Sequence, residues 1–378
     1  MSRDAVAALC GRSTEWLRQI ERGNRGTGLK MVVRLAEVLK VPDLTDLLGN
    51  DELPTVLYAR PEHPALGDVR RAMSSYVTAG SDPLPPSVDN VWARVRNAWQ
   101  LRAVSTHDRS DLAAVLPRLL VDAQRAARTA DTPAGHRALA EVYHLGQLYL
   151  CYQDAPELLW VVVDRGMSAA LESEDAAAFG RAAWFSAYLY RDFGHVDQAH
   201  QVVDDALRQL DAAPEQSPTV ARQRCIVHLA SAWNHARDGQ PARAWRDWDA
   251  AVDADRVAAE MPAAYVLFGA SCDDVALTLD VELGKIASAS RRANSIDVNA
   301  VGSLPRRTRL MIEATRGQML KREYAGAVHL LRRAQQTSPE ATLFSAYARS
   351  ITHELQAHAG PMLRGEVASL AESLGVPA

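Results

Sequence analysis

The sequence predicts an all-α protein, and three features support that fold class. No stretch alternates apolar and polar residues for long enough to form the strands of a sheet. From Val88 almost to the C-terminus the chain is rich in alanine, the strongest helix former. Short segments rich in Pro, Gly and Ser interrupt this region, as is typical of loops between consecutive helices.

Length and composition indicate a folded protein of more than one unit. At roughly 100–200 residues per domain, the 378 residues predict two or three units. Hydrophobic residues make up 48% and charged residues 23%, which is close to average globular usage and argues against disorder. The N-terminus does not resemble a signal peptide, and the longest nearly apolar run, Met261–Cys272, is shorter than the ~20 residues of a membrane helix. We therefore expect a cytoplasmic protein with no membrane partner.

Residues 1–49 are predicted to form short helices separated by tight turns. Asp4–Leu9 is the first helix, and Ser13 is a natural N-cap for a second helix that ends near Arg22. A third helix over residues 29–39 has apolar side chains at helical spacing, and Asp43 caps a last turn. Two helices joined by a tight turn can present one helix to a groove of DNA.

The rest of the chain divides into a linker and a long helical domain. Six prolines within residues 50–87 prevent any long helix there, so this segment is the predicted linker, with room for one short helix within residues 65–80. Residues 88–378 form the predicted helical-repeat domain.

Evenly spaced glycines indicate that this domain contains repeats. Gly194, Gly239 and Gly284 are 45 residues apart, each at the predicted turn of a helix pair, and alanine follows each of them five residues later. One helix pair cannot bury its apolar face alone, so repeated pairs stack into a curved solenoid. The alternative is an Ala-rich helical bundle without repeats.

The second helix of each predicted pair resembles that of the tetratricopeptide repeat (TPR). In that family a small residue is followed by a bulky one and another small one, at four and seven residues. The matching positions are Ala199/Val203/Ala206, Ala244/Trp248/Ala251 and Ala327/Leu331/Ala334. The period here exceeds the family's ~34 residues, which implies longer helices or loops. The resemblance implies a TPR-like α-solenoid.

Residues 2–23 carry a second resemblance. The features are a small residue where two helices cross, a glycine in the turn, a capping serine and two apolar anchors: Ala7, Gly11, Ser13, Leu17 and Ile20. With these residues the segment closely resembles the phage-repressor-like (XRE-type) helix-turn-helix family, and residues 29–48 continue the family pattern in order. The resemblance implies that the second helix enters the major groove of DNA.

The resemblance also assigns DNA contacts to individual residues. Base-edge contacts are implied for Thr14, Glu15 and Arg18, since Arg18 can bond to guanine and Glu15 can accept from cytosine. Phosphate contacts are implied for Arg12, Ser13, Asn24 and Arg25. Six Arg or Lys residues against three acids within residues 1–30 give the segment the basic character that phosphate binding needs.

One departure from the family concerns the start of the chain. The family's domain usually begins with another helix of roughly a dozen residues, which is missing here. Either the start codon is assigned too late, or the linker or repeats complete the core, or DNA binding is lost. Without that helix we expect exposed apolar flanks at Val6, Leu9 and Leu35. Trp16 is expected either to pack beneath the second helix or to touch a thymine methyl group.

The resemblance to helix-turn-helix plus TPR regulators also implies an effector site and a homodimer. In such regulators the inner helices line a concave groove that binds peptides or other effectors. Alignment on Gly194 and Gly239 places these side chains toward the groove: Arg181, Trp184, Tyr188, Leu229, Trp233 and Arg237. Asn234 is a further candidate that could bond a peptide backbone. Aromatic rings beside Arg suit an effector with an apolar and an acidic part. The alternative is that these aromatic side chains fill the core between repeats.

No sequence feature indicates catalysis, a metal or a cofactor. The chain has no P-loop, no GxGxxG after a strand and no GxSxG. His353 and His358 are five residues apart, whereas the zinc-protease motif needs four to place both on one helix face. The cysteines lie far apart with no CxxC pair and are expected to be buried free thiols: Cys10, Cys151, Cys225 and Cys272.

Two functions fit these observations. The first is a bacterial-type, sequence-specific DNA-binding regulator of transcription, whose helical repeats form a homodimer and sense a peptide or small-molecule effector. The alternative is a protein-binding scaffold that uses TPR-like repeats and carries a vestigial DNA-binding segment.

Overall fold

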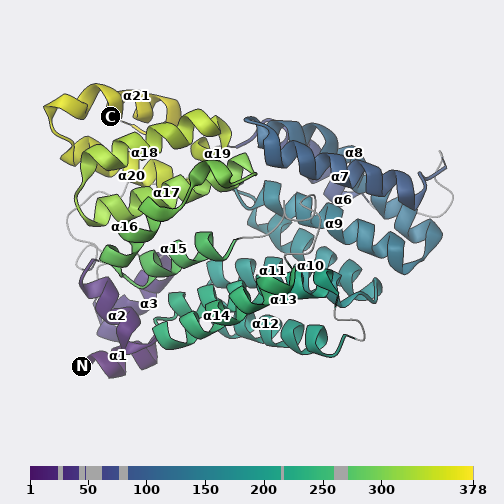
Figure 1. The fold of residues 1–378 in the computed structure, drawn as a ribbon, viewed down its shortest axis with the longest axis horizontal. Helices are drawn as coiled ribbons and strands as arrows, with labels where there is room; N and C mark the ends of the chain where they lie inside the picture. Colours follow the sequence, from purple (N-terminus) through teal and green to yellow (C-terminus); the bar gives the residue numbers. More distant parts are fainter. Residues whose placement is uncertain are drawn as a thin grey trace.

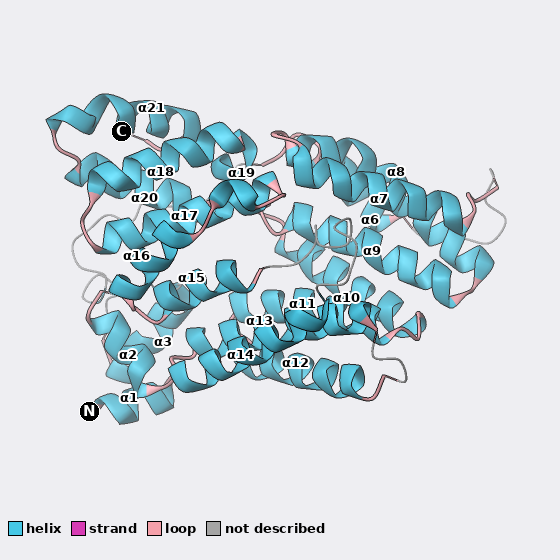
Figure 2. Cartoon of the chain, in the orientation of Figure 1, coloured by secondary structure: helices cyan, strands magenta, loops and turns pink. Residues whose placement is uncertain are grey.

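A computed structural model describes residues 1–23, 29–41, 47, 62–75, 84–213, 217–258 and 271–377. Over these ranges the chain is helical and contains no strand (Figure 2), which confirms the predicted fold class. No helix among them combines the length and apolar character needed to cross a membrane. Asn24, Arg25, the predicted cap Asp43 and most of the predicted linker lie outside the described residues.

The first three helices form a small N-terminal head, defined here as residues 1–41. They are α1 (Arg3–Leu9), α2 (Thr14–Glu21) and α3 (Leu29–Leu39). Their boundaries follow the sequence prediction to within a residue or two. The start of α2 is fixed by Ser13, which caps the helix by accepting a hydrogen bond from the Trp16 amide. Gly11 and Gly23, with φ of 65° and 69°, end the first two helices as residues without a Cβ can.

The expectation of exposed flanks in the head is wrong for two of its three residues. Val6 and Leu35 are only 4% and 7% exposed, because they pack together with Leu17 and Trp16 in one apolar cluster. Leu9 is 51% exposed, as expected. The described helices of the head therefore bury these two side chains in a shared apolar cluster that includes Trp16.

The helices beyond the head follow one another with short connections. They are α6 (Leu66–Ser74), α7 (Val88–Val104), α8 (Asp108–Ala130), α9 (Pro133–Leu150), α10 (Pro156–Glu172), α11 (Ala176–Asp192), α12 (Val196–Asp211), α13 (Pro218–Arg237), α14 (Pro241–Ala258), α15 (Cys272–Glu282), α16 (Ile286–Ser295), α17 (Leu304–Leu320), α18 (Tyr324–Thr337), α19 (Pro339–Leu343), α20 (Ala346–His358) and α21 (Arg364–Leu374). The short helix α6 is the one that the sequence predicts inside the linker.

The evenly spaced glycines form one repeated turn. Gly194, Gly239 and Gly284 have φ of 78°, 70° and 66° and join α11 to α12, α13 to α14 and α15 to α16. After each glycine the next amide donates to the carbonyl five residues back at 2.8 Å. The same turn joins α17 to α18 around Arg322, which has φ of 59° without being glycine. These bonds provide donors for carbonyls that a helix leaves unpaired at its C-terminus.

Small residues let the paired helices approach closely, as the repeat pattern predicts. The alanines at the predicted positions are at most 1% exposed: Ala199, Ala206, Ala244, Ala251, Ala289, Ala327 and Ala334. Trp248, at a predicted bulky position, is only half-buried and donates its indole N–H to the Cys272 carbonyl at 2.7 Å. The pattern therefore marks helix–helix contacts correctly.

Helices from the two ends of the domain beyond the head lie against one another. In Figure 1, α10–α14 run along the bottom of the view, while α7–α9 and α16–α21 lie above them on opposite sides. At the junction α17 packs against α7, and α19 packs against α8. The N-terminal head lies at the outer edge, beside α14 and α15 (Figure 1).

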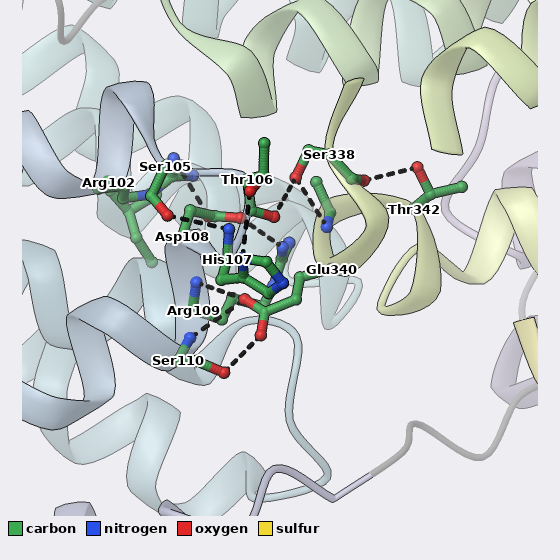
Figure 3. A network of polar contacts seen from close by, with 12 residues as sticks. Arg102, Ser105, Thr106, His107, Asp108, Arg109, Ser110, Ser338, Glu340 and Thr342 are labelled. Atoms are coloured by element: carbon green, nitrogen blue, oxygen red, sulfur yellow. Dashed lines mark hydrogen bonds and ion pairs between the residues drawn. The ribbon is translucent and has the colours of Figure 1, made fainter. Parts of the chain in front are cut away.

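A carboxylate from the C-terminal repeats caps a helix of the first repeats at this junction (Figure 3). Glu340 accepts hydrogen bonds from the amides of Arg109 and Ser110, at 2.9 and 3.1 Å, and from the Ser110 hydroxyl. A negative charge at the N-terminus of α8 is favourable because free amides and the helix dipole converge there. The guanidinium of Arg109 lies 4.2 Å from the ring centroid of Tyr152, so Arg109 also makes a cation–π contact.

The first prediction concerns this closing contact. Glu340→Gln keeps the side chain's shape but removes its charge, so we expect the free energy of unfolding to fall by about 1–3 kcal/mol. Urea denaturation measures it. Glu354→Gln, on an exposed position of α20, is the matched control and should change the free energy by less than about 0.5 kcal/mol. Equal effects of the two substitutions would contradict a stabilising closure.

The second prediction concerns pH. His144 is 2% exposed and stacks on Phe185 at 4.6 Å, and its burial lowers its pKa well below 6.5. The unfolded chain takes up this proton as the pH falls through about 6.5, whereas the folded chain does not, so acidification destabilises the fold. We expect the urea midpoint to decrease between pH 7 and pH 5, and to decrease less in His144→Phe. A pH dependence that is identical in the variant would refute this.

Candidate functional site

The head helix α2 has one buried and one open side. Trp16, Leu17 and Gln19 are 4–6% exposed and face the molecule. The three residues predicted to read base edges lie on the opposite, partly exposed side: Thr14, Glu15 and Arg18. The structure thus brings these three together on one partly exposed ridge, called the open ridge here, and Trp16 packs beneath the helix.

All three polar side chains of the open ridge have a partner in the head. Arg18 forms an ion pair with Glu15, and their side chains are 44% and 36% exposed. The Thr14 hydroxyl donates to the Asp4 carboxylate at 2.5 Å. An exposed ion pair contributes about 0–1 kcal/mol, so a ligand that offers better partners can displace it.

The N-terminal end of α2 faces the helical repeats. The Ser13 hydroxyl, besides capping α2, donates to the carbonyl of Asp238 at 2.6 Å. Burial lowers the pKa of the neighbouring Arg12, with Asp238 acting in the opposite direction. Two of the predicted phosphate contacts, Arg12 and Ser13, are therefore positioned against the α13–α14 turn, while Asn24 and Arg25 lie outside the described residues.

Two successive repeat turns hold the head. Gln19, 4% exposed, donates its side-chain amide to the carbonyl of Leu283 in the α15–α16 turn at 3.1 Å. At the turn before it, a Cβ on Gly239 would lie 2.6 Å from the Ser13 hydroxyl and 2.9 Å from the Trp16 amide. Glycine is thus required at position 239 for two reasons: the positive φ of its backbone, and the lack of room for a Cβ beside the head. Sequence reasoning found this glycine but not its second role.

Inside the array, three of the predicted effector residues come together. Tyr188 on α11 meets Trp233 on α13, with ring centroids 6.5 Å apart. Arg237, one helical turn after Trp233, forms ion pairs with Asp192 at 2.9 Å and with Glu282 at 3.7 Å. Burial alone would lower the pKa of Arg237, but these two carboxylates raise it.

The other three predicted effector residues hold helices together. Arg181 forms an ion pair with Glu141 at 2.9 Å. Asn234 is 3% exposed and donates to the Ala199 carbonyl at 2.9 Å. Trp184 is half-buried and packs against three apolar clusters. For the aromatic residues Trp184 and Trp233, the second of which is 7% exposed within a core cluster, the alternative of filling the core between helices describes their packing.

Three further arginines lie around Tyr188, Trp233 and Arg237, and sequence reasoning missed them. Together with Glu282 these side chains form what we call the inner cluster: Tyr188, Arg191, Trp233, Arg237, Glu282, Arg309 and Arg316. The guanidinium groups of Arg191 and Arg309 lie over the Trp233 ring, 4.2 and 4.5 Å from its centroid. Arg316 pairs with Glu313 at 2.8 Å and with Glu282 at 3.5 Å. The signal was present, since Arg309 and Arg316 are seven residues apart and therefore share one face of α17.

The inner cluster and the head contacts are adjacent along the chain. Arg237 directly precedes Asp238, whose carbonyl accepts from Ser13. Glu282 directly precedes Leu283, whose carbonyl accepts from Gln19. The ion pair between Arg237 and Glu282 thus connects the two turns on which the head rests.

In one serine–histidine contact the hydrogen bond runs in the wrong direction for the serine to be activated as a nucleophile. His63 Nε2 lies 3.1 Å from the Ser110 hydroxyl, but His63 Nδ1 accepts from the Ala65 amide at 3.2 Å, which places the ring proton on Nε2. The Ser110 hydroxyl donates in turn to Glu340. His63 is therefore a donor to Ser110 and cannot take its proton in this arrangement.

The cysteines are free thiols, and two of them come close together. Cys10, Cys151 and Cys225 are buried, whereas Cys272 is only partly so. The sulfurs of Cys225 and Cys272 are 4.0 Å apart, a contact that the sequence separation did not predict. Within the described ranges no three side chains of His, Cys, Asp or Glu are grouped so that they could hold a metal ion.

Comparison of the chain with protein-family models, with curated proteins and with solved structures found no match. The geometry of the head and of the inner cluster is therefore the basis for the functional conclusion.

The third prediction tests the contact between the head and the turn at Gly239. Gly239→Ala and Gly194→Ala both place a Cβ at a positive φ, which costs about 1–2 kcal/mol, but only at Gly239 does the Cβ meet the head. We expect hydrogen exchange of the amides in residues 3–21 to become faster in Gly239→Ala and to stay near that of the wild type in Gly194→Ala. Equal exchange in the two variants would count against the contact.

Proposed function

We propose that the chain is a sequence-specific DNA-binding regulator of transcription that acts as a cytoplasmic homodimer and responds to a peptide or small-molecule effector. The observation that carries this proposal is the open ridge of α2, where Thr14, Glu15 and Arg18 are accessible together. A guanidinium can bond to guanine through two donors, and a carboxylate can accept from cytosine.

The support of the ridge favours reading of DNA. Leu17 and Trp16 anchor the back of α2 in the core of the head, and Ser13 fixes its first turn. Side chains on an anchored helix keep their positions when a ligand approaches, which favours specific over non-specific contacts. The open ion pair between Arg18 and Glu15 is weak enough for base edges to replace it.

The two turns that bond to the head favour control by an effector. The Arg237–Glu282 ion pair links the two turns that hold α2, and both of its members belong to the inner cluster. A ligand that changes this pair changes the spacing of the turns and thereby the orientation of α2. In a dimer, the positions of two such helices must match half-sites about one turn of DNA apart.

A second function, a protein-binding scaffold with a vestigial DNA-binding segment, is favoured by a different observation. Ser13 and Gln19 use their donors inside the molecule, so the N-terminal end of α2 is turned toward the repeats. In that function the head is a fixed part of the repeat array, and its release changes nothing in DNA binding.

The fourth prediction separates the two functions. Arg18→Ala removes the proposed guanine contact and should weaken binding to the DNA upstream of the protein's own gene by about 1–3 kcal/mol, measured by fluorescence anisotropy. Wild-type affinity should fall steeply with salt because phosphate contacts release counterions. Arg208→Ala, on the exposed side of α12, is the matched control and should leave the affinity unchanged.

The Gly239→Ala variant adds a second arm to this experiment. If the repeats restrain a DNA-reading head, its release should change DNA affinity relative to Gly194→Ala. Absence of salt-dependent binding in the wild type, together with no effect of Arg18→Ala, would refute the regulator and favour the scaffold.

A further inference from the structure

Two positively charged groups converge on one indole in the inner cluster. The guanidinium carbons of Arg191 and Arg309 lie 4.2 and 4.5 Å from the ring centroid of Trp233. Each contact is a favourable cation–π interaction. Both groups carry full positive charge, however, so their closeness is unfavourable unless an anion lies nearby.

Neither arginine has a carboxylate partner among the described residues. Arg191 is 8% exposed and donates to the neutral side-chain oxygen of Asn234 at 3.0 Å. Arg309 is exposed and forms no hydrogen bond or ion pair with any residue in the described ranges. Its guanidinium is thus oriented by Trp233 while its forked N–H donors stay available.

The carboxylates closest to this pair are already used. Asp192 pairs with Arg237 at 2.9 Å, and Glu313 pairs with Arg316 at 2.8 Å. Burial lowers the pKa of Arg191 to about 10 even though Asp192 acts in the opposite direction. These carboxylates act on the two arginines without forming an ion pair with either: Asp192 raises the pKa of Arg191, and, against the effect of burial, Glu313 and Asp274 raise that of Arg309.

Two buried donors in the same cluster are also unpartnered. Arg191 Nε and Trp233 Nε1 have no hydrogen-bond partner among the described residues, although Arg191 is 8% and Trp233 7% exposed. A buried N–H without an acceptor costs roughly 1–3 kcal/mol. A ligand with acceptor oxygens would satisfy them and offset the repulsion between the two guanidinium groups.

We propose that Arg309, Arg191 and Trp233 form a binding site for a small-molecule oxyanion, a carboxylate or a phosphate. Arg309 supplies the accessible forked donors, and Arg191 supplies the second charge. This assignment rests on the proposed function, because it names the chemical class of the effector. Trp233 lies one helical turn before Arg237, so the bound anion acts next to the ion pair that links the two turns under the head.

The experiment measures binding by titration calorimetry on the full chain, in chloride buffer of constant ionic strength and without DNA. The probes are inorganic phosphate in one arm and benzoate in the other. We expect saturable binding of at least one probe, weakened about tenfold or more in Arg309→Gln. Arg246→Gln, on an exposed position of α14, is the matched control and should bind like the wild type. The probe that binds identifies the source as phosphate or carboxylate.

Stability provides a second readout. Arg309→Gln loses the cation–π contact with Trp233 but also removes the repulsion from Arg191, so the urea midpoint should change little. A midpoint as low as that of Glu340→Gln would show that Arg309 has a mainly structural role, and it would overturn the proposal, as would no binding or equal binding by all three proteins. DNA is absent from this experiment, so its failure leaves the DNA-reading ridge to be judged by Arg18→Ala alone.

Discussion

The carbonyl groups at the C-terminal ends of the repeat helices are the constraint on which this arrangement depends. A helix leaves its last carbonyls without donors, and they must be paired when they are buried. Most are paired by the repeated turn itself, but the carbonyls of Asp238 and Leu283 accept from Ser13 and Gln19 of the head. These two contacts tie α2 to the turns after α13 and α15.

Charge inside the array is distributed unevenly around the same turns. Glu282 is shared by Arg237 and Arg316, while Arg191 and Arg309 lie over Trp233 without a carboxylate of their own among the described residues. A buried ion pair is strongly sensitive to a new charge nearby, because the local dielectric constant is low. In the proposed regulator, an anion bound at Trp233 would act next to the Arg237–Glu282 ion pair, which joins the two turns that contact the head.

The sequence predicted the local features well because their causes are local. A serine at an N-cap, as at Ser13, pairs amides only three residues away. A glycine such as Gly239 reaches a positive φ without a partner, and alanines such as Ala206 mark close helix contacts by their size. The candidate site was predicted only in part. Tyr188, Trp233 and Arg237 came from the repeat spacing, whereas Arg309 lies more than seventy residues from Trp233 and belongs to another helix pair.

By itself, the sequence determined the fold class, the helix ends, the repeated turn and the open ridge of α2, since each depends on side chains within a few turns of one helix. Only the tertiary structure decided that Ser13 and Gln19 bond to the turns after α13 and α15, that Val6 and Leu35 are buried, and that Glu340 bonds to Ser110. These contacts join residues up to 264 positions apart. Their geometry comes from the packing of many helices against one another, which no single segment of the chain encodes.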